Sequence, residues 1–496
     1  ASGSAAGGKT IKIGVFEPAS GDNGAGGKQE VLAIEYANSI APTVDIGGET
    51  YNVELVEVDN QSSTDKAVTA AQELVSKKVS IVLGSYGSGC SIAAAPTFQA
   101  ASIPAIGCSC TNPAVTEANP YYFRVCFLDP FQGSVMANFA KDEFSAANAY
   151  VLSMLGEDYG SGLATYFVNA FEDLGGTVTS EQFPEGTSDF SAYIQNAINA
   201  GADVIFAPCA TTYAAQIITQ AASAGFDKPI TAGDTWESSV ILDAQKGTSV
   251  QVYCSTFFDE NDDSGAAKEF VTGFKEWLNA DSQKLTNNGG NDIVAAVSAL
   301  GYDGYMVALE AIKAAGSTDG TAIRDALYGV NYDGVTGSIT FDQTTGDANK
   351  DMAYIKKAAD GAFEFVKTQT VANDATQGTP ATYTTDGVKL DTEGKKIVIG
   401  VFEPTSGDNA AGGKQEVIGA QYANSLDNKV TIAGEEYTVE LYVSDNGSVD
   451  EQAGTAASNI VNQHALISLG SYGSGVSIAA ADTFAAAGIP AIGVSC

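Results

Sequence analysis

Three loops of this 496-residue chain, each expected to follow a strand, carry residues suited to binding a small anion. Small residues let backbone N–H groups and hydroxyls approach a carboxylate closely, without a buried basic side chain. Any one of these loops alone is better explained as a turn, but together they predict a site at the carboxyl ends of strands. The loops are EPASGDNGAGG (17–27), GSYGSG (84–89) and CSCTNP (108–113).

Catalytic chemistry is poorly supported, because the chain contains a single histidine, His464. Histidine is the commonest general base and metal ligand, so its scarcity argues against Ser-His-Asp, Cys-His and multi-histidine zinc sites. The sequence also lacks a phosphate-binding GxxxxGK[ST] loop, a GxGxxG motif that opens a helix after a strand, and a CxxC pair. We therefore expect no enzyme activity, no cofactor and no metal; a carboxylate-based hydrolase is the alternative that a turnover screen would detect.

The composition indicates a soluble, multi-domain protein with an acidic surface. Asp and Glu number 60 against 24 Lys and Arg, which gives a formal net charge of −36. Nucleic acids and anionic lipid surfaces are bound through clustered Lys and Arg, so neither is an expected partner. The acidity is interpreted as a contribution to solubility, with adaptation to high salt as the alternative. No apolar run reaches the roughly 18 residues of a membrane-spanning helix.

The seven cysteines are scattered and odd in number, which does not suggest a disulfide framework, although a single bridge stays open. Most of them lie in apolar runs, where a free thiol behaves as a small core residue. Residues 1–8 are expected to form a flexible tether, and no signal peptide is recognisable in them.

Short apolar runs alternate with amphipathic segments along the chain. This alternation predicts an α/β fold in which helices cover both faces of parallel sheets, with ligands bound beyond the carboxyl ends of the strands. The expected strands lie at 10–16, 51–59, 79–85, 103–109, 149–155, 177–183, 203–209 and 229–234. The expected helices lie at 27–40, 64–77, 91–101, 160–174, 189–199 and 212–224.

Residues 9–110 are repeated at 395–496, in register and without a gap, after a linker-like stretch at 373–394. The segment LGSYGSGCSIAAA (83–95), for example, recurs as LGSYGSGVSIAAA (469–481). Two interpretations stay open. Either the natural polypeptide continues into a second full unit, or residues 395–496 complete a lobe with residues 111–372 and leave 9–110 free for domain swapping between chains.

Five segments of the first 370 residues resemble the type I periplasmic-binding family, in particular the branched-chain amino-acid-binding branch that serves ABC importers. The stretch from Thr111 to Gly133, with TNP, PYYFR and a later D and QG, is the most specific. The resemblance implies two Rossmann-like lobes joined by a three-strand hinge near 126–130, 253–258 and 335–344. The matching segments are 16–38, 84–140, 151–176, 230–239 and 296–312.

The resemblance also implies roles for particular residues. Ser88, Ser109 and Thr111 would bind the ligand carboxylate from the first lobe, Tyr159 would close over the ligand from the second, and Asp234 would meet its α-ammonium. An acid is expected there because a cation removed from water needs a fixed anion. Trp236 and Tyr302 are candidate walls of the side-chain pocket, with core aromatics as the alternative.

The chain departs from the family at Gly26, where many members have an aromatic residue. The second copy repeats two of the serines, as Ser474 and Ser495, and ends before an equivalent of Thr111.

These features predict lobe 1 at 9–126 and 257–335, lobe 2 at 127–256 and 336–372, and a partial second copy of lobe 1 at 395–496. The expected function is capture of an amino acid or similar small polar metabolite by lobe closure, for the membrane subunits of an ABC importer. Such a protein would act outside the cytoplasm, at the cell surface or in the periplasm, with or without a lipid anchor. The alternatives are a ligand-sensing receptor module and a self-assembling surface protein that uses the repeated segment.

Overall fold

The computed structural model describes residues 8–371, apart from 118, 263, 264, 351 and 360, and residues 394–494, apart from 408 and 433. The chain divides into two compact units, Ala1–Gln377 and Gly378–Cys496. Most of the expected tether (1–8) and linker (373–394) lies outside the described residues. Within the described part, no helix combines the length and apolar character that crossing a membrane requires.

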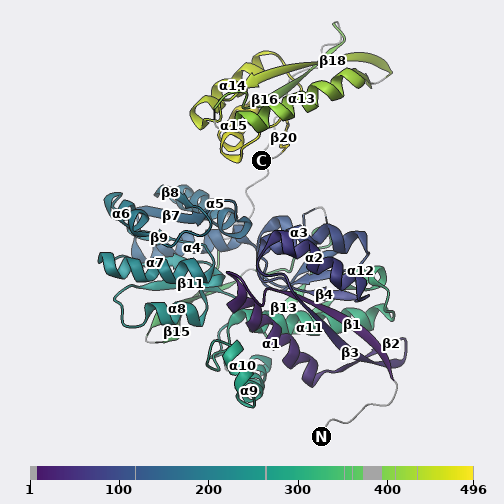
Figure 1. Ribbon diagram of the computed structural model, residues 1–496, viewed down its shortest axis with the longest axis vertical. Helices are drawn as coiled ribbons and strands as arrows, with labels where there is room; N and C mark the ends of the chain where they lie inside the picture. Colours follow the sequence, from purple (N-terminus) through teal and green to yellow (C-terminus); the bar gives the residue numbers. More distant parts are fainter. Residues whose placement is uncertain are drawn as a thin grey trace. The chain divides into compact units, whose positions relative to one another are not determined.

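The first sheet of unit 1 has the strand order β2-β3-β1-β4-β5-β6 and is parallel except for the antiparallel β2. Its central strands are short apolar runs that are buried on both faces, as expected for a parallel sheet between helices. Figure 1 shows this sheet in one lobe of unit 1. The strands are β1 (Lys9–Glu17), β2 (Thr43–Ile46), β3 (Glu49–Asp59), β4 (Ile81–Leu83), β5 (Ala105–Gly107) and β6 (Tyr122–Arg124).

Helices cover both faces of this first sheet. The helix α1 packs along α11, where the Tyr305 hydroxyl donates to Asn38 Oδ1 (2.9 Å) and to the Ala41 carbonyl oxygen (2.7 Å). Residues 9–110 supply five of the six strands of this sheet, together with the helix α1 against which α11 packs. The helices are α1 (Gly24–Ile40), α2 (Thr64–Ser76), α3 (Ser88–Ala100), α9 (Gly265–Asn279), α10 (Ser282–Asn287), α11 (Ala296–Ala315), α12 (Gly320–Leu327) and the short η1 (Pro113–Val115).

The second sheet of unit 1 has the order β15-β14-β11-β10-β9-β7-β8, with antiparallel pairing only at β11-β14 and β14-β15. Its strands are β7 (Asn148–Met154), β8 (Thr177–Phe183), β9 (Val204–Phe206), β10 (Ile230–Ala232), β11 (Val252–Thr256), β14 (Ala353–Ala359) and β15 (Ala362–Gln369). Its helices are α4 (Asp129–Phe144), α5 (Asp158–Asp173), α6 (Ser191–Asn199), α7 (Thr211–Ala224), α8 (Ser239–Gln245) and the short η2 (Asp234–Trp236).

The chain passes between the two lobes three times: between β6 and α4, between β11 and α9, and between β13 and β14. A separate two-stranded sheet, β12 (Asn331–Gly334) with β13 (Gly337–Thr340), precedes the third passage. The mixed α/β fold with parallel sheets confirms the fold class expected from the sequence.

Unit 2 contains one five-stranded sheet of order β17-β18-β16-β19-β20, which repeats the order β2-β3-β1-β4-β5 of unit 1. The described residues include no counterpart of β6 or α11 in this unit. The strands are β16 (Lys396–Glu403), β17 (Lys429–Ile432), β18 (Glu435–Asp445), β19 (Ile467–Leu469) and β20 (Ala491–Ile492). The helices are α13 (Ala410–Leu426), α14 (Asp450–Asn462) and α15 (Ser474–Ala486).

All six cysteines among the described residues are buried free thiols, as expected for core residues. Cys496 lies outside the described residues.

Candidate ligand-binding site

A cavity of about 400 Å³ lies between the two lobes of unit 1, at the carboxyl ends of their strands. Lobe 1 contributes the loops after β1 and β4, the start of α2 and Ser109, and lobe 2 contributes the loops after β7, β9 and β10. Its volume is within the usual range for small-molecule sites. Of the seven site residues expected from the sequence, Ser88, Ser109, Tyr159 and Asp234 line it.

Ser88 opens helix α3, and the first turn of that helix faces the cavity. The preceding Gly87 has φ of 112°, a left-handed conformation that favours glycine, and it provides no side-chain cap. The Ser88 hydroxyl oxygen accepts from the Asn112 N–H (3.2 Å). A helix N-terminus without a cap is a favourable position for an anion, because its first N–H groups lack partners and the helix dipole is positive there.

Ser109 follows β5 and lines the same side of the cavity, but its hydroxyl donates to Glu30 Oε1 on α1. The Ser109 oxygen therefore presents its lone pairs to the cavity while Glu30 accepts its hydrogen. Thr111, two residues further on, is fully buried beside Asp129 and is not among the cavity-lining residues. Its role as a carboxylate ligand stays a prediction.

Arg124 holds the loop that carries Ser109 and Thr111 in place. This fully buried guanidinium on β6 donates from Nη1 to the carbonyl oxygens of Cys110 (2.8 Å) and Asn112 (2.7 Å). Its Nε donates to Asp347 Oδ1 at 2.6 Å, so the charge is paired. Sequence reasoning did not single out this residue, although PYYFR belongs to the most specific stretch of the family resemblance.

Asp234 lies on the opposite side, in η2 after β10, with 2% of its surface exposed. Its Oδ1 accepts from Gln132 Nε2 (2.8 Å) and from the Tyr159 hydroxyl (3.0 Å). Burial raises the pKa of Asp234 to about 6, and the bonds from Gln132 and Tyr159 oppose that rise. This carboxylate is therefore held in one orientation, and its pKa lies just below neutral pH. Both properties suit it to receive a ligand cation. Gln132 belongs to the QG of the resemblance but was not predicted in the site.

The first turn of α5 differs from that of α3, because a carboxylate already caps it. Glu157 accepts from the backbone N–H groups of Tyr159 (3.1 Å) and Gly160 (2.5 Å), and burial raises its pKa to about 7. Among the described residues that line the cavity there is no Lys, Arg or His. The carboxylates that line it are Asp22, Asp65, Glu157, Asp158, Glu185 and Asp234.

Trp236 and Tyr302 do not line the cavity. Trp236 is fully buried in the core of lobe 2, where its Nε1 donates to the Cys209 carbonyl oxygen at 3.1 Å. Tyr302 lies on α11 and packs against Phe270, with ring centroids 4.7 Å apart, and Tyr36. Both positions correspond to the alternative stated above, in which these residues are core aromatics.

An aromatic wall that sequence reasoning missed is provided by Tyr86, in the loop between β4 and α3. Its ring occupies the space above Gly26, where a Cβ would overlap it. Its hydroxyl approaches the Thr235 carbonyl oxygen of lobe 2 at 3.5 Å. The absence of a side chain at Gly26 is therefore what makes room for Tyr86. Tyr86 is visible in the sequence as part of GSYGSG, but only the fold shows that its ring lies above Gly26.

Direct hydrogen bonds join the lobes on either side of the cavity. Asn112 Nδ2 donates to the Asp158 carbonyl oxygen at 2.7 Å, and the Tyr213 hydroxyl donates to Asp22 Oδ2 at 3.1 Å. These contacts form only when the lobes are close together, so they belong to a closed arrangement of the two lobes.

Unit 2 carries only part of these residues. Ser474, the counterpart of Ser88, opens α15 and is exposed, whereas Ser88 is 1% exposed. Ser495, the counterpart of Ser109, lies outside the described residues.

Comparisons with known proteins agree with this geometry. A profile of periplasmic binding proteins matches residues 10–362 and again 396–496. The Leu/Ile/Val-binding protein homolog 1 of Brucella abortus is 28% identical over 371 residues, which cover 72% of this chain and 93% of that protein. Among solved structures, a leucine-binding protein from Thermotoga maritima is 33% identical, with a TM-score of 0.67 over 73% of this chain and 99% of that one. The branched-chain amino acid transporter substrate-binding protein of Streptococcus pneumoniae, solved with isoleucine, is 28% identical, with a TM-score of 0.64 and coverage of 73% and 99%.

Proposed function

The chain belongs to the periplasmic binding protein family, and from this premise we propose that unit 1 captures a free α-amino acid for an ABC importer. It is a substrate-binding protein of the ABC-transporter type, and its relatives include proteins that bind branched-chain amino acids. The observation that carries the proposal is the polarity of the cavity. An uncapped helix N-terminus lies on the lobe 1 side, and an oriented, buried carboxylate lies on the lobe 2 side.

This polarity suits a zwitterion that bridges both lobes. A ligand carboxylate at the first turn of α3 would gain the N–H groups around Ser88, and an α-ammonium would pair with Asp234. Only the closed arrangement offers both sets of contacts, so the ligand stabilises closure by its differential affinity. Tyr159, whose hydroxyl already donates to Asp234, would hold that carboxylate in the ammonium-binding orientation.

The lining also suggests which amino acids bind best. Among the described residues that line the cavity there are six carboxylates and no Leu, Ile, Val or Phe. A leucine or isoleucine side chain would find few apolar partners there, whereas a polar or cationic side chain would be favoured electrostatically. We therefore expect amino acids with polar or basic side chains to bind more tightly than the branched-chain ones, and anionic aromatic acids to bind poorly.

A role in uptake implies where such a protein acts and which partners it has. Periplasmic binding proteins act outside the cytoplasm, and closure of the two lobes would be the signal for the membrane subunits. A location at the cell surface or in the periplasm is part of this proposal, with or without a lipid anchor. A receptor module would use the same clamp without an importer, and co-purification with ABC membrane subunits distinguishes the two. No enzymatic step is proposed, because the relatives of the chain are solute-binding proteins.

A ligand screen followed by one substitution tests the proposal. The twenty proteinogenic L-amino acids and benzoate are compared by thermal shift and then by calorimetry with the full chain. Asp234→Asn is expected to weaken the best amino acid by about 10- to 150-fold, because it removes a charged hydrogen-bond partner worth roughly 1.5–3 kcal/mol. Asp65→Asn is the matched control, since Asp65 is an exposed carboxylate at the same cavity.

Equal weakening by both substitutions would indicate a general field effect and would remove Asp234 from the ammonium site. Stabilisation by benzoate alone would contradict the proposal that the ligand is an amino acid.

Unit 2 supports a second, additional proposal, which is self-association of the chain. The apolar residues that α11 and β6 cover in unit 1 have exposed counterparts on α13 and β20. Large exposed apolar patches mark interaction surfaces or aggregation-prone ones.

A further inference from the structure

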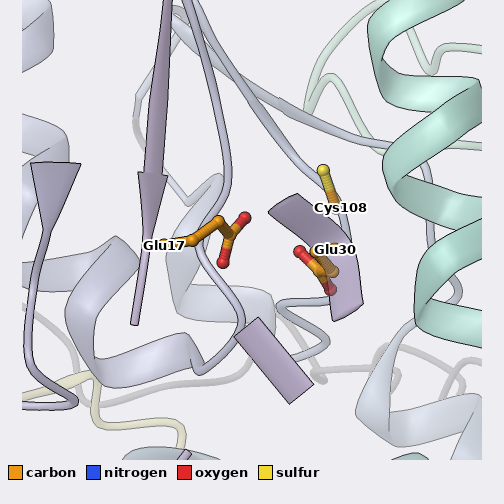
Figure 2. A group of neighbouring side chains, drawn as sticks. All are labelled: Glu17, Glu30 and Cys108. Carbon is orange, nitrogen blue, oxygen red and sulfur yellow. The ribbon is translucent and has the colours of Figure 1, made fainter. Parts of the chain in front are cut away.

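Behind the cavity wall, two carboxylic acids face each other in the core of lobe 1. Glu17 ends β1 and Glu30 lies on α1; they are 1% and 0% exposed. Figure 2 shows their carboxyl groups directed towards one another, with Cys108 on the neighbouring loop. One carboxyl oxygen of each acid and the Cys108 Sγ lie within 4.8 Å of one another.

Each carboxyl group also holds a residue that lines the cavity. Glu17 Oε2 accepts from the Tyr86 N–H at 2.5 Å, and Glu30 Oε1 accepts from the Ser109 hydroxyl. The other two oxygens, Glu17 Oε1 and Glu30 Oε2, are buried and have no N–H or O–H donor in the described part of the chain. A proton between the two carboxyl groups would satisfy both oxygens at once.

Charge also favours a shared proton. Two adjacent carboxylates in a buried site do not both ionise unless a cation compensates them. Among the described residues, the groups that face Glu30 include no cation. They are Glu17 from β1, Tyr86 after β4, Ser109, Cys108 and Cys110 after β5, and Asp234 across the cavity. From α11, the uncharged Gly301 packs against the Glu30 backbone. Burial raises the pKa of Glu17 well above its usual range and that of Glu30 to about 7.

The same pair recurs in unit 2, where Glu403 and Glu416 are the counterparts of Glu17 and Glu30. Glu403 Oε2 accepts from the Tyr472 N–H at 2.7 Å, and burial followed by the Glu416 carboxyl raises the pKa of Glu403 to about 8. The position of Cys108 is occupied there by Val494. The recurring feature is therefore the two acids without the thiol, which favours a shared proton over a metal ion.

We propose that Glu17 and Glu30 share one proton and act as positioning residues, which set whether Ser109 accepts or donates in the cavity and so couple ligand binding to proton uptake. This inference rests on the proposed function, because it concerns the same cavity. With Glu30 ionised, Ser109 gives its hydrogen to Glu30 and repels a ligand carboxylate. When the pair takes up a second proton, at Glu30 Oε1, Glu30 donates to Ser109, and the serine hydroxyl is free to donate to the ligand.

The sign of the pH dependence follows. A ligand carboxylate beside Ser109 favours protonated Glu30, so affinity falls as pH rises through about 7, by at most about tenfold per pH unit. The ammonium favours ionised Asp234, so affinity also falls as pH drops below about 6. Binding of a zwitterion is therefore strongest between these two values.

The shared proton is tested without a ligand, by infrared spectroscopy of the full chain at pH 8. Glu17→Gln should remove the C=O absorbance of one protonated carboxyl group, because Glu30 alone ionises. Glu49→Gln, at an exposed residue paired with Lys9, should leave that absorbance unchanged. An unchanged spectrum of Glu17→Gln, or one equivalent of a divalent metal in the purified protein, would overturn the shared proton.

The coupling is tested by calorimetry in two buffers of different ionisation enthalpy. The titrant is the proteinogenic L-amino acid that gives the largest thermal shift. At pH 7.5 the wild type should take up a fraction of a proton on binding, and between pH 7.5 and 8.5 its Kd should rise up to tenfold. Glu30→Gln should abolish the proton uptake and the rise in Kd between pH 7.5 and 8.5, because its amide donates to Ser109 at every pH. Glu416→Gln, the same change in unit 2, should behave as wild type.

Proton uptake that persists in Glu30→Gln would overturn the coupling even if the infrared result stands. If none of the amino acids binds, the proposed function and the coupling fail together, and the infrared experiment alone decides the shared proton. If Glu30→Gln does not fold, Ser109→Ala takes its place in the calorimetry and should abolish the rise in Kd above pH 7.5, because it removes the hydroxyl through which Glu30 acts on the ligand.

Discussion

Ser88 and Asp234 face one cavity from two lobes, and their surroundings give them opposite preferences. The Ser88 side offers the first N–H groups of an uncapped helix, whereas Asp234 is a buried carboxylate with two donors that keep it oriented. Residue type alone does not determine this difference, because Glu157 is also an acid in the cavity and yet serves as a helix cap. The neighbours of each side chain determine its chemistry.

The space above Gly26 gives a prediction at the residue scale. Gly26→Ala places a methyl group where the Tyr86 ring lies, so Tyr86 must leave its position beside the cavity. We expect at least a tenfold loss of affinity for the best amino acid, measured by calorimetry, because a displaced wall disturbs the fit; about 1.4 kcal/mol suffices for this loss.

Unit 2 provides the control for this substitution. Gly412 is the counterpart of Gly26, and a Cβ there would overlap the Tyr472 ring in the same way. Gly412→Ala should therefore perturb the fold similarly but leave affinity unchanged. Equal affinity of Gly26→Ala and wild type would show that Tyr86 is not a wall of the site.

At the scale of elements, the sequence pattern predicted strands and helices only up to residue 234, and within that range it missed β2, β6 and α4. The helix expected at 64–77 is α2 at Thr64–Ser76, and that expected at 212–224 is α7 at Thr211–Ala224. The starts of α1 and α3 came three residues earlier than expected. Their first turns are rich in Gly and Ser. These residues have low helix propensity, so the sequence predicts a loop at those positions.

The site was less accessible to sequence reasoning than the elements. Ser88, Ser109, Tyr159 and Asp234 line one cavity, because parallel strands end at the same edge of each sheet. Their individual roles came from family resemblance and stay predictions. Whether an aromatic residue faces a cavity or a core depends on tertiary packing. For this reason Tyr86 was missed, and the sequence did not decide whether Trp236 and Tyr302 are pocket walls or core aromatics.

Arg124 gives a prediction at the element scale, since it ties the loop after β5 to β6 and to Asp347. Arg124→Met should lower the free energy of unfolding by about 3–5 kcal/mol, because it leaves buried carbonyl oxygens and an acid without their partner. Chemical denaturation of the full chain measures this change. The second arginine, Arg324, pairs with the exposed Asp325, and Arg324→Met should cost less than about 1 kcal/mol. Similar losses for both variants would contradict the structural role of Arg124.

At the scale of the whole molecule, the two units share a fold segment but differ in what covers it. Leu32 and Tyr36 on α1 are 3% and 8% exposed, because α11 and α9 pack against that helix. Their counterparts on α13, Ile418 and Tyr422, are 64% and 63% exposed. Within the described residues of unit 2, no helix covers this face of α13.

An exposed apolar face of this kind favours pairing between copies of the chain. In a second copy α11 is already covered, so the face of α13 meets the same face of its partner in a symmetric contact. Light scattering of the full chain should show an apparent mass that rises with concentration. Changing Ile418 and Tyr422 together to Glu should abolish the rise, because it places charges at the apolar contact. Changing Ile40 and Ile198 to Glu, two isolated exposed residues of unit 1, should not. A wild-type mass that stays monomeric at every concentration would mean that the exposed face of unit 2 has no partner in a second copy of the chain.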